Sequence, residues 1–230
     1  DTIGVSVLKD AGYDAYIVGG TVRDFFLGNQ PHDIDITTNA LPEEMLSLFE
    51  DAGYRVIPTG INHGTITVID PVNGPVEITT YRTEGEYSDG RRPDYVNFSS
   101  SIEEDLARRD FTMNAIAYDP TDGRVVDPYG GQNDIEQGVI RTVGNPTELF
   151  MEDGLRPLRA ARFSSTLGFD IDSETLDAMS DPKVIENFGK VSKERVRDEV
   201  LKAMSGDNPV SFVETTMATG LNQHIIPELY

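Results

Sequence analysis

The sequence predicts an α+β fold, in which a mixed β-sheet domain over residues 1–144 precedes an all-helical domain over residues 145–230. Three observations predict it. Short segments before residue 144 alternate apolar and polar residues as half-buried strands do. After Asn145 the strand patterns stop, and apolar residues recur at helical spacing. The 230 residues suffice for one large core or for two smaller domains side by side.

The elements expected before residue 144 follow from these patterns and from turn signals. Pro42 suits the first turn of a helix. Asn73-Gly74 and Asp122-Gly123 are hairpin signals, and the polar, glycine-bearing segment 85–94 indicates a loop. In chain order we expect a helix ending at 8–12, a strand at 15–18, a helix at 21–27, a strand at 33–37, a helix at 41–52, strands at 65–69 and 76–81, a helix at 102–109, and strands at 115–118 and 124–126.

The second domain is expected to be helical, and the composition of the whole chain restricts its function. Helical periodicity covers residues 148–167, 173–180, 192–204 and 208–219. No cysteine is present, which excludes disulfides and thiolate chemistry. No apolar run reaches membrane-spanning length, so we expect a cytoplasmic protein without a membrane partner. Because the chain begins at Asp1 rather than Met, we expect it to be a fragment of a longer protein.

The net charge of −21, from 40 acidic and 19 basic residues, is unusual for a protein that binds nucleic acid. Two interpretations stay open. The acidic residues serve solvation, or a basic RNA-binding part lies beyond Tyr230. The charge argues against tight nucleic-acid binding by this piece alone. It permits a local cationic site, because the arginines are clustered.

Two carboxylates form the first candidate site. Asp33 and Asp35 lie two apart on a predicted strand, so both side chains point to the same face. Like charges repel unless a cation lies between them, and Mg²⁺ prefers oxygen ligands. Glu77, on a nearby predicted strand, is a candidate third acid. The alternative for all three is a solvated strand face.

A glycine turn lies shortly before this pair. Gly19 and Gly20 allow backbone amides to approach a phosphate at the start of the following helix, where Arg23 adds a cation. The alternative is an ordinary tight turn. Neither the dinucleotide-binding nor the Walker phosphate motif is present. A phosphate site beside a two-carboxylate metal site indicates phosphoryl or nucleotidyl transfer.

A row of charged residues forms the second candidate site. Asp153, Arg156, Arg159 and Arg162 recur every third residue on the predicted helix 148–167. A surface ion pair would explain Asp153 and Arg156, and it would contribute roughly 0.3–0.5 kcal/mol to stability. Three arginines in register should repel one another unless an anion such as a triphosphate lies nearby. Asp is acceptor-only and Arg donor-only, so the pair would accept cytosine and adenine and reject uracil and guanine.

Four ordered segments of the chain resemble the motifs of class II tRNA nucleotidyltransferases and bacterial poly(A) polymerases. The segments are Val18–Asp24 with Asp33–Asp35, Arg108–Ala115, Glu152–Phe163 and Val191–Arg197. The resemblance implies a polymerase-beta-like head followed by a helical neck, with the tRNA-holding body and tail largely absent. It implies metal ligands at Asp33 and Asp35. It implies nucleotide contacts at Gly20, Arg23, Arg109, Asp153, Arg156, Arg159 and Arg162.

The second of these motifs contains Arg108, Arg109, Asp110 and Asn114. The resemblance implies that Arg109 contacts the triphosphate, and that Asp110 or Asn114 lies near the ribose. The alternative is a capping and ion-pair role at the end of helix 102–109. In the family, the segment corresponding to residues 81–93 helps to convert C addition into A addition. A solvated surface loop is the alternative there.

The resemblance implies CCA addition, the transfer of CMP and AMP from CTP and ATP to a tRNA 3′ end with Mg²⁺ as cofactor. The partners would be the tRNA 3′ end, CTP and ATP, while the oligomeric state stays open. An A-adding enzyme or a poly(A) polymerase of the same family is an alternative. A non-catalytic nucleotide- or RNA-binding module is a further one.

Overall fold

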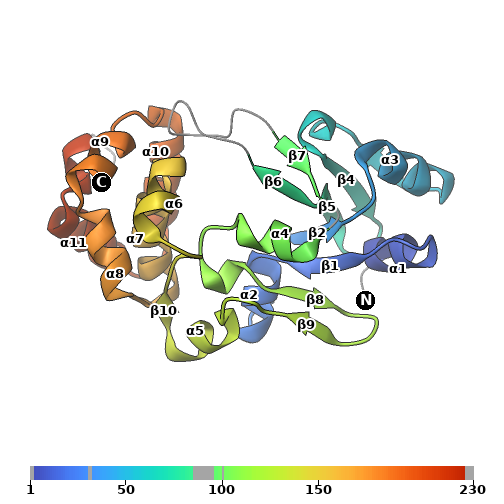
Figure 1. Ribbon diagram of the computed structural model, residues 1–230, viewed down its shortest axis with the longest axis horizontal. Helices are drawn as coiled ribbons and strands as arrows, with labels where there is room; N and C mark the ends of the chain where they lie inside the picture. The colour runs from blue at the N-terminus through green and yellow to red at the C-terminus, as the bar shows by residue number, and fades with distance from the viewer. Residues whose placement is uncertain (1–2, 31–32, 85–95, 100, 226–230) are drawn as a thin grey trace. The chain divides into compact units, whose positions relative to one another are not determined.

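A computed structural model describes residues 3–30, 33–84, 96–99 and 101–225 of the chain (Figure 1). They form two compact units, which are described separately. The first unit takes the described residues within 1–84, 96–109 and 113–135. The second takes residues 110–112 and those described from 136 onward. The domain boundary expected at residue 144 from the sequence stays a prediction, since the two compact units are defined by their internal contacts and not by function.

The first unit is built on a seven-stranded sheet with the order β3-β4-β5-β2-β1-β8-β9 (Figure 1). β2 and β5 pair in parallel, whereas β1 pairs with both β2 and β8 in antiparallel fashion, so the sheet is mixed as predicted. The strands are β1 (Ala15–Val18), β2 (Ile34–Thr38), β3 (Arg55–Ile57), β4 (Thr65–Asp70), β5 (Gly74–Thr80), β8 (Ala117–Asp119) and β9 (Arg124–Val126).

Two helices of this unit bury one face of the sheet. Leu8 of the first helix and Phe49 of the third share a core with the strand residues Ile36 and Ile78. Because side chains alternate along a strand, the strand residues directly before and after each of these isoleucines face the other side of the sheet. The helices are α1 (Ile3–Asp10), α2 (Gly20–Phe26), α3 (Pro42–Asp51), η1 (Ile61–His63) and α4 (Ile102–Ala107). A separate hairpin joins β6 (Arg82–Glu84) to β7 (Val96–Phe98).

The second unit is a helical layer around its own core, in which α7 packs against α10 and α11. Phe150, Leu158, Phe188 and Phe212 are buried there. The helices are α6 (Pro146–Glu152), α7 (Arg156–Leu167), α8 (Ser173–Met179), α9 (Pro182–Phe188), α10 (Lys193–Met204), α11 (Pro209–Thr219) and η3 (Leu221–His224). Two elements, η2 (Thr112–Asn114) and α5 (Gly131–Gln137), contain residues of both units.

Two sequence-based expectations about the second unit are wrong. The helix expected over 148–167 is two helices, and Asp153 between them has an extended backbone with φ −138°. Pro157 explains the break, since proline fits the first turn of α7 but not a helix interior. A strand also follows Asn145. β11 (Asp170–Ile171) pairs in parallel with β10 (Val139–Ile140).

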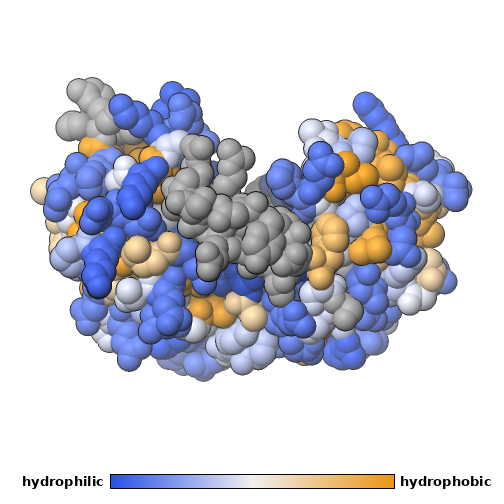
Figure 2. All heavy atoms as spheres, turned by 45° about the horizontal axis from the view of Figure 1, so that its top comes forward, coloured by the Kyte–Doolittle hydropathy of each residue, from blue (hydrophilic) through white to orange (hydrophobic). Residues whose placement is uncertain are grey.

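The described surface is largely hydrophilic on the face drawn in Figure 2, and apolar patches are scattered between the hydrophilic side chains. Within the ranges that the structure describes, no helix has the length and apolar character needed to cross a membrane.

Candidate active site

The glycine turn and the acidic strand of the first unit are tied together by one hydroxyl. β1 ends at Val18, and Gly19, with φ +66°, adopts a left-handed conformation that favours glycine before α2 begins. The hydroxyl of Thr21 donates to the backbone oxygen of Asp33 at 2.8 Å. It accepts the backbone N–H of Asp35 at 3.2 Å. The start of α2 therefore fixes the position of the acid pair.

Asp35 lies beside two further acids. It is the register partner of Glu77 across the parallel pair β2·β5, so the two side chains are neighbours on one face of the sheet. Burial and then the charge of Glu77 raise the pKa of Asp35 to about 6, with a smaller contribution from Asp33. Asp33 itself is exposed and precedes β2 in a bend, so the strand begins one residue later than predicted.

The donor set fits a divalent cation. The charges of Glu77 and Asp33 raise the pKa of Asp35, an effect that a bound cation would oppose, and oxygen ligands suit Mg²⁺. In the part of the chain that the structure describes, no group of three or more acidic or histidine side chains is placed so as to hold a metal ion. Asp33, Asp35 and Glu77 therefore stay predicted ligands.

Two guanidinium groups lie over the glycine turn. A Cβ added to Gly20 would be 3.3 Å from Nη2 of Arg23, and one added to Gly19 would be 3.4 Å from Nη1 of Arg109. Arg23 also donates from Nη1 to Oδ1 of Asn114 at 2.9 Å. Two cations beside a glycine turn at the start of a helix are an arrangement that suits a phosphate.

Asp105, which sequence reasoning missed, holds the side chains of Arg108 and Arg109 from the protein interior. Its side chain is fully buried, and its oxygens accept from Nε of Arg108 at 3.4 Å and from Nη2 of Arg109 at 3.1 Å. Burial alone would raise the pKa of Asp105, but the two arginines hold it below its usual value. The signal in the sequence was the spacing of three and four residues between the acid and the arginines.

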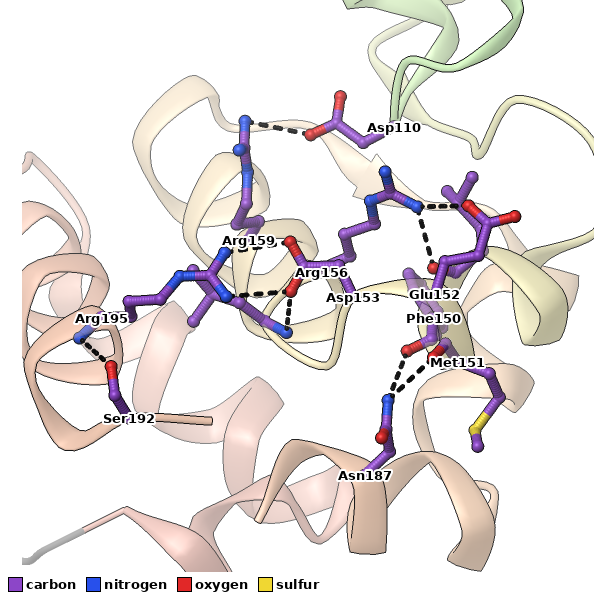
Figure 3. Close-up of polar contacts among 12 residues, drawn as sticks. Asp110, Phe150, Met151, Glu152, Asp153, Arg156, Arg159, Asn187, Ser192 and Arg195 are labelled. Carbon is purple, nitrogen blue, oxygen red and sulfur yellow. Dashed lines mark hydrogen bonds and ion pairs between the residues drawn. The ribbon is translucent and has the colours of Figure 1, made fainter. Parts of the chain in front are cut away.

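In the second unit, Asp153 is held by an arginine from another helix (Figure 3). Nη1 of Arg195 donates to Oδ1 of Asp153 at 3.2 Å, and Nη2 donates to Oδ2 at 3.0 Å. The backbone N–H of Leu155 donates to the same Oδ1 at 3.0 Å. The Asp153 side chain is thus a nearly buried, bidentate partner of Arg195, a geometry that strongly fixes a carboxylate.

The shared helix face expected for Asp153 and Arg156 is wrong, because Asp153 lies outside α7. Arg156 is buried and donates from Nη1 to the backbone oxygen of Leu149 at 3.0 Å and to Glu152 at 2.9 Å (Figure 3). The two residues remain close in the chain, and the Arg156 backbone N–H donates to the Asp153 backbone oxygen at 3.2 Å.

The remaining arginines of α7 also have carboxylate partners. Nη2 of Arg159 lies 3.0 Å from Oδ2 of Asp110, and Nε of Arg162 donates to Glu199 at 2.7 Å. The guanidinium of Arg162 also lies 3.9 Å from the centre of the Phe163 ring. The anions that three arginines in register were expected to require are carboxylates of the protein itself, so the spacing of these arginines does not by itself indicate a triphosphate.

The structure thus gathers the predicted residues in two groups. The group in the first unit is Gly19, Gly20, Arg23, Asp33, Asp35, Glu77, Arg108, Arg109 and Asn114. The group in the second unit is Asp110, Asp153, Arg156, Arg159 and Arg162. The expected loop at 85–94 lies outside the described residues. Sequence reasoning also missed the partners Thr21, Glu152, Arg195 and Glu199, whose contacts fix these groups.

Comparisons with known families match both units. A family described as the "Poly A polymerase head domain" matches residues 15–141. A second, described as the "Probable RNA and SrmB- binding site of polymerase A", matches residues 168–230. The first match contains the predicted residues of the first unit and Asp110, whereas Asp153, Arg156, Arg159 and Arg162 lie between the two matched ranges.

Relatives and solved structures agree with these matches. A CCA-adding enzyme of Leuconostoc mesenteroides subsp. mesenteroides is 48% identical over 91% of this chain and 50% of its own length. The crystal structure of the Bacillus stearothermophilus CCA-adding enzyme in complex with CTP has a TM-score of 0.86 and 40% identity, over 96% of this chain and 52% of that one. A Thermotoga maritima CCA-adding enzyme complexed with tRNA has a TM-score of 0.78 and 26% identity, over 96% and 50%. The chain therefore spans about half the length of the relatives that it matches.

Proposed function

This chain belongs to the poly A polymerase head domain family, and on that premise we propose that the protein adds CMP and AMP from CTP and ATP to the 3′ end of tRNA, releasing pyrophosphate. The observation that carries the proposal is the position of Asp35 and its acidic neighbours beside a glycine turn with two guanidinium groups. The names of the relatives, CCA-adding enzymes, support the choice of product. We expect the protein to act in the cytoplasm.

The residues of the first unit have separate roles in the proposed transfer. Asp33 and Asp35, with Glu77 as a neighbouring acid, would hold Mg²⁺. When bound, such an ion lowers the pKa of an attacking hydroxyl and stabilises the charge of the leaving oxygens. Arg23, Arg109 and the amides of the glycine turn would hold the triphosphate in position and stabilise the negative charge that collects on pyrophosphate. No side chain is required as a general base.

The residues of the second unit would select the base. The carboxylate of Asp153 accepts hydrogen bonds only, and the guanidinium of Arg156 only donates them. Cytosine and adenine both offer an amino donor beside a ring-nitrogen acceptor, which complements this pair. Uracil and guanine offer a carbonyl and a ring N–H instead, which would place an acceptor against the carboxylate and a donor against the guanidinium, so we expect them to bind less well.

The second candidate is an A-adding enzyme or a poly(A) polymerase, which the description of the matching family favours. The two candidates differ in the product. CCA addition ends after three nucleotides and uses both CTP and ATP, whereas poly(A) synthesis uses ATP alone and has no fixed length.

The test is single-nucleotide analysis of the products on tRNA that ends before its CCA. With Mg²⁺ and labelled CTP alone, we expect two added residues, and ATP should then add one more. A ladder made from ATP alone would instead support poly(A) polymerase. Failure to incorporate any nucleotide, with CTP binding still detectable, would support a non-catalytic binding module. The variant Asp35→Ala is the control for contaminating activity.

A further inference from the structure

We propose that Asp105 is a positioning residue that sets the affinity of the site for a triphosphate by fixing the guanidinium groups of Arg108 and Arg109. The inference rests on the proposed nucleotide site of the first unit and adds a residue that determines how tightly this site binds a triphosphate. Asp105 lies in α4, and both of its oxygens face the protein interior, so it does not itself contact a ligand.

The contacts of Asp105 come from three residues. Oδ1 accepts from the backbone N–H of Arg82 at 3.2 Å and from Nε of Arg108 at 3.4 Å. Oδ2 accepts from Nη2 of Arg109 at 3.1 Å. A carboxylate with 0% exposed side-chain area and several charge-assisted partners cannot move without leaving buried charge uncompensated. Asp105 is therefore a rigid anchor for the arginines.

The two terminal nitrogens of the Arg109 guanidinium lie in different surroundings. Nη2 is held by Asp105, and Nη1 lies at the glycine turn, within 3.4 Å of a Cβ position on Gly19. The Arg109 side chain is therefore ordered before any ligand arrives. A side chain that is already fixed loses less conformational entropy on binding, which increases affinity.

A competing anion makes this anchor necessary. Arg109 also attracts Asp35, the candidate metal ligand on β2. Without the charge of Asp105, the attraction of Arg109 to Asp35 would remain. The arginine would then neutralise the metal-binding acids instead of facing a phosphate. Asp105 thus keeps the phosphate-binding cation apart from the acids.

The test compares the binding of CTP and of cytidine to the wild-type protein and to Asp105→Asn, which keeps the shape but removes the charge. We expect CTP to bind about tenfold to a hundredfold more weakly to the variant, while cytidine, which has no phosphate, binds as before. Equal losses for CTP and cytidine, or an unchanged CTP affinity, would overturn the proposal.

A matched control is Asp119→Asn in the same unit. Asp119 is also buried and accepts from Lys9 and Thr121, away from the two arginines. Its loss should lower stability without changing the ratio of CTP to cytidine affinity. If Asp105→Asn does not fold, Asp105→Glu carries the same test, because it retains the charge but displaces it by one methylene. An unchanged affinity ratio in that variant would equally overturn the proposal.

The outcomes separate this inference from the proposed function. If the wild-type protein binds CTP no more tightly than cytidine, the triphosphate site itself is wrong. If the wild-type protein prefers CTP and Asp105→Asn keeps that preference, only the role of Asp105 is wrong.

Discussion

Replacing Asp35 by asparagine should stabilise the fold while abolishing nucleotide transfer. Burial and the charge of Glu77 raise the pKa of Asp35 from 3.8 to about 6, so its ionised form is unfavourable in the folded state. A difference of about 2 pKa units at about 1.4 kcal/mol each corresponds to a cost of about 3 kcal/mol at pH 7. Asn has nearly the same shape without the charge, so Asp35→Asn should recover about 1–3 kcal/mol.

The sign of the pH dependence is fixed by the same shift. Because the folded-state pKa lies above the unfolded value, protonation of Asp35 favours the fold, and that stability is lost as the pH rises through about 6. The advantage of Asp35→Asn over the wild type should be complete above the folded-state pKa. It should disappear as the pH falls towards the unfolded value of about 4.

The assay is urea unfolding followed by circular dichroism at pH 7 and pH 4.5, with a chelator present, and then again with Mg²⁺. Added Mg²⁺ should stabilise the wild type more than the variant, because only the wild type keeps both predicted aspartate ligands. Asp70→Asn is the matched control. Burial alone would raise the pKa of Asp70, but hydrogen bonds from Val72 and Asn73 lower it, so this change should destabilise the protein. A less stable Asp35→Asn at pH 7, or an advantage that does not shrink in acid, would refute the reasoning.

Three further changes test the remaining predictions. Asp33→Ala should abolish transfer with the circular dichroism spectrum unchanged, and substantial residual incorporation would contradict its metal role. Asp153→Ala should loosen discrimination against UTP and GTP, which competition between labelled nucleotides measures; unchanged discrimination would argue against base selection by this carboxylate. Arg195→Ala should reduce discrimination in the same direction and cost about 1–3 kcal/mol of stability, because it leaves the nearly buried Asp153 without its bidentate partner. Thermal unfolding measures the stability, and selectivity equal to that of the wild type would show that Arg195 does not position Asp153.

Local patterns in the sequence were sufficient for the elements that carry the first site. The apolar run Ala15–Val18 forms a strand of the expected extent, because a short strand is bounded clearly by the glycines that follow it. Asp35 and Glu77 share a face because strand side chains alternate with a period of two, a rule that needs no tertiary information. The register that makes them neighbours, by contrast, depends on which strands pair.

Side-chain partners distant in the sequence could not be predicted. Arg195 contacts Asp153 from 42 residues away, and Arg23 contacts Asn114 from 91 residues away. Spacing within a helix favoured Arg156 as the partner of Asp153. The helix ends before Asp153, however, and a new one begins at Arg156, so the two residues share no helix face. In both cases the packing of separate elements decided the partner, and no local pattern records it.

The carboxylate partners of the α7 arginines have a consequence for ionic strength. A cation that is exposed to water holds mobile counterions, and their release makes the binding of an anion depend steeply on salt concentration. Arg159 and Arg162 instead hold Asp110 and Glu199, anions that are attached to the protein. Phosphate binding at these residues would exchange one anion for another and would release few ions to the solvent. Any contribution of Arg159 and Arg162 to nucleotide affinity should then fall only gently as salt is added.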